Sequence, residues 1–227
     1  MKSVLISIQP KWCELIASGK KTVEVRKTKP KIDTPFKCYI YCTNSKKEFL
    51  QSRNNVLFYC ENRDFIGGHG CGWYQRLNGK VIGEFVCDRV QPFESEFVDD
   101  DCYEFVASLD YDEDGDATGF IEWSNDSDFS YESTDFYKKC CVKYEELKKY
   151  MGYGINQFYA WHISALVIYD NPKELREFRK SGALSYDDWL YGMYNGTCES
   201  SYEKYLLPFT VTRPPQSWCY VEGVEGE

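Results

Sequence analysis

Residues 7–27, SIQPKWCELIASGKKTVEVRK, contain the pattern that decides the fold: a helix, a tight turn and a polar strand. Pro10 suits the first turn of a helix, and apolar residues follow at helical spacing through Ile16. Gly19 is placed to close this helix, because glycine readily adopts the left-handed backbone that ends helices. Valines alternate with polar residues at 22–26, which predicts a short strand with one apolar and one polar face.

The predicted strand buries Val23 and Val25 and displays Thr22, Glu24 and Arg26 as a polar row. Glu24 is the single carboxylate in a strongly basic stretch, SGKKTVEVRKTKPK at 18–31, and Lys11 in the preceding helix adds another cation. We therefore expect Glu24 and Arg26 to be neighbours two residues apart on one face.

Positive charge is concentrated near the start of an acidic chain. The whole chain has 27 basic and 36 acidic residues and a net charge of −9. Residues 1–47 contain ten lysines and one arginine against three carboxylates, a balance of +8, so residues 48–227 carry −17. This asymmetry predicts attraction of a polyanion to the basic end. The alternative is a solvated basic face with no partner.

The remaining chain predicts a single α+β domain over 1–227, because 227 residues with 43% hydrophobic content suffice for one core. YEELKKYM at 144–151 predicts a helix. Pro172 is expected to begin another, short helix. Apolar segments predict strands at 3–8, 36–43, 80–90, 158–170 and 217–222. Between these elements we expect three insertions, at about 44–79, 98–138 and 181–209.

No signal peptide or membrane-spanning segment is evident, so we expect a cytoplasmic protein without a membrane partner. The eleven cysteines are an odd number and mostly lie within apolar patterns, which predicts small core residues in a reducing compartment.

The order of these elements, with G-x-K-T-x-E-x-R at 19–26, resembles the ASCH domain, a small barrel related to the PUA fold. The segments KCYIYCT, GKVIGEF, YAWHISALVIYDNPKELREF and RPPQSWCYVE resemble the later elements of ASCH proteins of phages and gut Firmicutes. The resemblance implies a PUA-like mixed β-barrel with flanking helices. It also implies a cleft beside the first helix that holds RNA or a modified nucleoside.

The resemblance places Lys21, Glu24 and Arg26 in that cleft. The Lys21 ammonium suits a phosphate, the planar Arg26 fork suits a phosphate or a base edge, and Glu24 accepts hydrogen bonds from a base. Alternatively, Glu24 and Arg26 only pair with each other or with a neighbouring strand. Tryptophans are candidates for stacking bases, Trp161 among them. The predicted ligand-binding residues are Lys20, Lys21, Thr22, Glu24, Arg26, Trp12 and Trp73.

Whether the chain is an enzyme stays open. Some ASCH proteins that it resembles are amidohydrolases that remove acyl groups from modified cytidine, with a lysine matched by Lys21 and a threonine nucleophile. Glu24 occupies the position of that threonine and cannot supply the same alkoxide chemistry. If the chain is an enzyme, Lys21 and Glu24 are the candidate catalytic residues. For a nuclease, His162 is a candidate base, or else a buried structural histidine.

We predict no metal and no cofactor. Residues 110–116 resemble the start of a calcium loop, but the twelfth position is Ile121 instead of the required glutamate. Cys60, His69 and Cys71 have no standard zinc spacing and no evident fourth ligand. A third class of function is a protein-interaction factor, in which the acidic insertions mimic nucleic acid and occupy the groove of a basic host protein.

Overall fold

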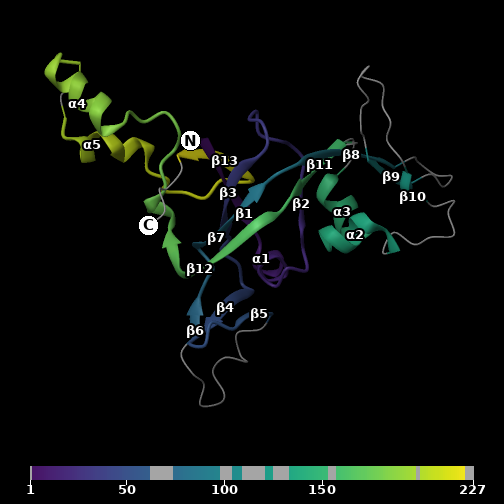
Figure 1. The fold of residues 1–227 in the computed structure, drawn as a ribbon. Helices are drawn as coiled ribbons and strands as arrows, with labels where there is room; N and C mark the ends of the chain where they lie inside the picture. Colours follow the sequence, from purple (N-terminus) through teal and green to yellow (C-terminus); the bar gives the residue numbers. More distant parts are fainter. Residues whose placement is uncertain are drawn as a thin grey trace, which may run out of the picture. The chain divides into compact units, whose positions relative to one another are not determined.

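The protein is represented by a computed structural model, which describes residues 2–61, 74–97, 104–108, 121–124, 133–152, 157–197 and 200–222 (Figure 1). The chain divides into two compact units. The first comprises Met1–Pro10, Lys37–Glu84 and Val167–Glu227, and the second comprises Lys11–Phe36 and Phe85–Leu166.

The first unit is built on a five-stranded sheet with the order β12-β7-β3-β1-β13. Its centre is β1, which pairs in parallel with β3 and antiparallel with β13. Six of the seven β1 residues are buried, as expected for a continuous apolar strand in a sheet centre. The strands are β1 (Lys2–Ile8), β3 (Phe36–Cys42), β7 (Lys80–Cys87), β12 (Ser164–Glu174) and β13 (Trp218–Glu222).

Two smaller substructures of the first unit occupy predicted insertions. A three-stranded sheet of order β5-β4-β6 falls within 44–79. Four short helices are described after β12, and three of them lie within 181–209. The strands are β4 (Glu48–Ser52), β5 (Leu57–Cys60) and β6 (Tyr74–Arg76), and the helices are η3 (Leu175–Glu177), α4 (Tyr186–Tyr194), α5 (Tyr202–Leu206) and η4 (Leu207–Phe209).

The second unit contains an antiparallel sheet of order β10-β9-β8-β11-β2, so β2 is its last described strand. Helices α2 and α3 lie beside β8 and β11 in Figure 1. The strands are β2 (Val23–Arg26), β8 (Val90–Phe97), β9 (Glu104–Ser108), β10 (Ile121–Ser124) and β11 (Gln157–His162), and the helices are α1 (Pro10–Ala17), α2 (Asp135–Cys140) and α3 (Tyr144–Met151).

The apolar face of β2 packs against α2 and α3, as the valine alternation predicts. Three phenylalanine rings from β8, α2 and β11 stack at the centre of this core, with centroids 4.5–5.7 Å apart. The cluster shields its aliphatic and aromatic surface from water, which is the main source of stability for such a layer. Its buried residues are Val23, Val25, Phe93, Phe136, Cys140, Tyr144, Leu147, Met151, Phe158 and Ala160.

Several sequence predictions are confirmed. Helix α1 begins at Pro10, and Gly19 follows its end with a φ of +73°. Helix α3 has the bounds predicted for 144–151. Five cysteines are buried as core residues: Cys13, Cys38, Cys42, Cys87 and Cys140.

None of the described helices is long and apolar enough to cross a membrane.

The single strand predicted at 158–170 is wrong. The segment is two strands in different sheets. Ile163 donates its N–H to the Thr22 carbonyl, one position beyond the last pair of the β11–β2 ladder, and Ala165 then takes a φ of +44°, which redirects the chain into β12. Pro172 begins no helix and lies inside β12, whose place at the edge of its sheet tolerates a residue without an N–H. The described strands form three open sheets and no closed barrel. The fold class is α+β.

Gly83 in β7 marks a close approach of two strands. A Cβ added there would lie 2.3 Å from the backbone oxygen of Val167 in β12. We therefore expect Gly83→Ala to lower the free energy of unfolding by about 1–3 kcal/mol, because backbone cannot move aside as a flexible side chain can. Urea unfolding checks this. The control is Lys204→Ala, which truncates an exposed side chain of α5 and should change the free energy of unfolding by at most about 0.5 kcal/mol. Equal midpoints for Gly83→Ala and the wild type would contradict the prediction.

Candidate functional site

Lys21, Glu24 and Arg26 form a compact group, here called the charge cluster. Glu24 joins the two cations: its Oε2 lies 3.4 Å from Lys21 Nζ and its Oε1 lies 3.0 Å from Arg26 Nη2. The three residues are only 2%, 6% and 7% exposed, respectively. The sequence therefore correctly predicts that Glu24 and Arg26 are neighbours. It wrongly predicts that the polar row of β2 is displayed to solvent.

The polar row is buried because aromatic residues share its face. Glu24 lies opposite Trp161 on β11, and Arg26 lies opposite Tyr159, so these four side chains are on one side of the sheet. Trp161 is fully buried, with the edge of its ring against Phe36 at 5.7 Å between centroids. Trp161 is therefore a core residue and not a platform for bases.

Lys21 also stabilises the end of a helix. Its ammonium donates to the Cys140 carbonyl at 2.5 Å, and Cys140 is the last residue of α2. Lys27 does the same for α3, donating to the carbonyl of its last residue, Met151, at 3.0 Å. Helix carboxyl ends carry partial negative charge, so a cation there is favourable. Two of the predicted basic residues thus have a structural role in addition to any binding role.

The charge cluster holds Glu24 between two cations. An ionised carboxylate oxygen has about two acceptor positions, so each oxygen keeps capacity for a further donor. A carboxylate paired with two cations is suited to fixing charge and orienting donors. It does not reproduce the hydroxyl nucleophile of the amidohydrolases that the sequence resembles.

Among the described residues of this unit, three aromatic rings each have a lysine ammonium above them. Lys11 Nζ lies 4.3 Å from the Trp12 ring centroid, and Lys21 Nζ lies 5.2 Å from the same ring. The second and third of these lysine–aromatic pairs are Lys27 with Tyr150 at 5.1 Å and Lys29 with Tyr159 at 5.6 Å. Such distances are within the range of cation–π attraction.

Tyr150 and Tyr159 are residues that the sequence prediction missed. Burial raises the pKa of Tyr150, while the charge of Arg26 and a hydrogen bond with it act to lower that pKa. Tyr150 therefore lies against the charge cluster. Alternation along 157–162 places Tyr159 on the same face as Trp161, which is the signal that could have identified it. Helical spacing alone gives no comparable signal for Tyr150.

His162 is partly exposed, at 32% of its side chain, and its Nδ1 lies 2.9 Å from Asp88 Oδ1. Burial acts to raise the pKa of Asp88, but hydrogen bonds with His162 and Ser164 outweigh it and lower that pKa. His162 lies opposite Val23, on the other face of the sheet from Glu24. His162, the candidate base, and the charge cluster therefore lie on opposite faces of the sheet.

The remaining predicted residues are placed as follows. Lys20 is exposed, and Thr22 and Trp12 are half-buried. Lys20 and Thr22 are the sequence neighbours of Lys21. Trp73, His69, Cys71 and residues 110–116 lie outside the described residues, as does much of the acidic insertion at 98–138. Within the described ranges, no three His, Cys, Asp or Glu side chains are grouped to hold a metal.

Comparison with solved structures finds an ASCH protein from Zymomonas mobilis, with 15% identity and a TM-score of 0.41 over 97% of this chain and 87% of that one. A mutant of the same Zymomonas mobilis protein has 14% identity and a TM-score of 0.44, over 98% of this chain and 91% of that one. No curated protein matches the chain.

The family model of the ASCH domain matches residues 6–149. This range contains α1, the charge cluster, α2 and most of α3. The segments 159–178 and 213–222, which contribute to the resemblance in sequence, lie outside it. Since the match covers more than half of the 227 residues, the chain belongs to the ASCH domain family.

Proposed function

We propose that this chain binds RNA or a modified nucleoside on the basic surface formed by α1 and the residues that flank β2. The observation that carries the proposal is the set of three lysine–aromatic pairs around the charge cluster, Lys11–Trp12, Lys27–Tyr150 and Lys29–Tyr159. Proteins that bind single strands combine cations for the phosphates with aromatic rings for the bases. The pairs supply both kinds of group side by side.

The charge distribution supports the same proposal. The charge cluster has two cations and one carboxylate, and it lies in the part of the sequence where the balance is +8. Lys20 is exposed and Lys11 is about half exposed, so both are accessible to a phosphate. In this proposal the lysines attract the backbone, and Trp12 and the two tyrosines contact bases.

The proposal predicts salt-dependent binding of a short RNA. Fluorescence anisotropy of a labelled single-stranded hexamer should show saturable binding that weakens as salt rises, because each neutralised phosphate releases counterions. We expect Lys11→Gln/Lys27→Gln to reduce the slope of log K against log salt by about 1.4, from about 0.7 for each single-strand phosphate contact.

The matched control is Lys204→Gln, which removes an exposed lysine from α5 in the other unit and should leave the slope unchanged. Circular dichroism spectra of all variants establish that they are folded. Lack of saturable binding of the hexamer by the wild type at low salt would overturn RNA binding and leave the modified nucleoside as the ligand of this surface. If the slope of log K against log salt is unchanged in the double variant, Lys11 and Lys27 do not contact the RNA, and their lysine–aromatic pairs are not part of the binding surface.

A further inference from the structure

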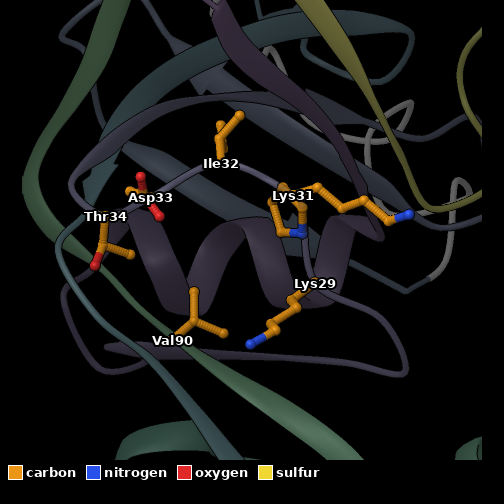
Figure 2. Close-up of a pocket in the computed structure, with 7 residues that line it drawn as sticks. Lys29, Lys31, Ile32, Asp33, Thr34 and Val90 are labelled. Carbon is orange, nitrogen blue, oxygen red and sulfur yellow. The ribbon is translucent and has the colours of Figure 1, made fainter.

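A pocket of about 310 Å³ lies in the loop between β2 and β3, and it is called the loop pocket here (Figure 2). Its volume falls in the range of small-molecule sites. No residue that lines it belongs to the ligand-binding set predicted from the sequence. The lining residues are Lys29, Pro30, Lys31, Ile32, Asp33, Thr34 and Val90.

The chemical groups of the loop pocket are separated by kind. Figure 2 shows Asp33 and Thr34 on one side and the two lysines, Lys29 and Lys31, on the other. Ile32 and Val90 contribute apolar side chains between them. A nucleotide has a matching division: an anionic phosphate, apolar faces on the base, and N–H groups on the base edge. Ammonium groups bind phosphate, and a carboxylate accepts hydrogen bonds from a base amine.

The loop pocket lies on the same face of the sheet as the charge cluster. Val90 is opposite Trp161, which is opposite Glu24, so the three side chains point to one side. Two strand spacings separate Val90 from Glu24, which is a distance of about 10 Å between backbones. A single nucleoside cannot occupy both places, whereas two linked nucleotides can.

Tyr159 connects the two places. Its ring has Lys29, a residue of the loop pocket, above it at 5.6 Å, and its partner on β2 is Arg26 of the charge cluster. Tyr159 is half-buried, so part of its surface is open to a ligand. The path from pocket to cluster therefore contains a cation, an aromatic ring and a second cation in succession, which is the pattern that follows a single-stranded backbone.

We propose that the loop pocket is a second nucleotide subsite, and that the ligand is single-stranded RNA of at least two nucleotides and not a free nucleoside. The inference rests on the proposed function, because it assigns one nucleotide to the surface at the charge cluster and the next to the loop pocket. Lys29 and Lys31 bind the phosphate, Ile32 and Val90 contact the base or sugar, and Asp33 accepts from the base edge.

The test compares cytidine 5′-monophosphate with the 5′-phosphorylated dinucleotide of cytidine, as competitors of a labelled RNA hexamer. We expect the dinucleotide to bind at least about tenfold more tightly, since occupying one subsite raises the effective concentration at the other. Lys31→Ala should reduce this advantage and leave the affinity for the mononucleotide unchanged, since Lys31 lines the loop pocket and belongs to none of the three lysine–aromatic pairs. Val90→Phe, which reduces the pocket and keeps its charge, should also reduce it.

Lys46→Ala is the matched control, since it removes one exposed lysine from a loop of the other unit. If the wild type binds the hexamer but the loop-pocket variants keep the dinucleotide advantage, the subsite is wrong and the proposed function stands. If the wild type binds mononucleotide and dinucleotide equally, the subsite is also wrong. If the wild type binds none of the probes, the proposed function fails and the subsite with it.

Discussion

Replacing Glu24 with alanine is expected to lower the free energy of unfolding by about 3–5 kcal/mol, because it leaves Lys21 and Arg26 as buried cations without their shared carboxylate. Both cations are less than 10% exposed, so water cannot replace the lost partner. Urea unfolding at neutral pH, followed by circular dichroism, measures the change. Glu24→Gln retains the shape without the charge and should also be destabilised.

The matched control is Glu61→Ala. Glu61 pairs with Lys47 at 3.1 Å, but both side chains are more than 50% exposed, so its loss should change the free energy of unfolding by at most about 1 kcal/mol. Similar unfolding midpoints for Glu24→Ala and Glu61→Ala would contradict the buried network. RNA binding by any variant of the charge cluster must be measured at temperatures where that variant is folded.

The second large effect is expected at Trp161. Trp161→Ala should lower the free energy of unfolding by about 3–5 kcal/mol, because the ring is fully buried and its removal leaves a cavity beside Phe36. Thermal unfolding followed by circular dichroism checks this.

Trp12→Ala provides the contrast. Trp12 is only half-buried and lies under Lys11, so we expect a smaller loss of stability and a weaker affinity for RNA, by about 1–3 kcal/mol if the ring stacks a base. The assignment of Trp161 to the core would be contradicted if Trp161→Ala unfolded like the wild type and lost only RNA affinity.

The sequence predicts those elements whose signals are local. Helix α1 can be identified because Pro10 and Gly19 mark its two ends. The apolar side of β2 can be identified because Val23 and Val25 alternate with polar residues. These features depend on neighbours within a few positions along the chain, which is the range over which periodicity and turn chemistry act.

The burial of the polar row could not be predicted, because the residues that cover or bind it are distant in sequence. Cys140 accepts from Lys21 across 119 positions, and Trp161 lies opposite Glu24 only through strand pairing. Residue types in the sequence therefore identify the candidate site. They do not predict that it is buried, because its burial depends on tertiary packing.

Lys21, which joins β2 to the end of α2, bears on how the motif should be used to assign activity to members of this family. Lys21 is required by the geometry of the folded chain, since its ammonium binds the Cys140 carbonyl and Glu24 together. Selection for a stable fold would retain such a lysine in a descendant that no longer binds or transforms any ligand. Its presence in the motif therefore identifies shared ancestry and architecture, and activity must be assigned from the neighbouring residues that differ.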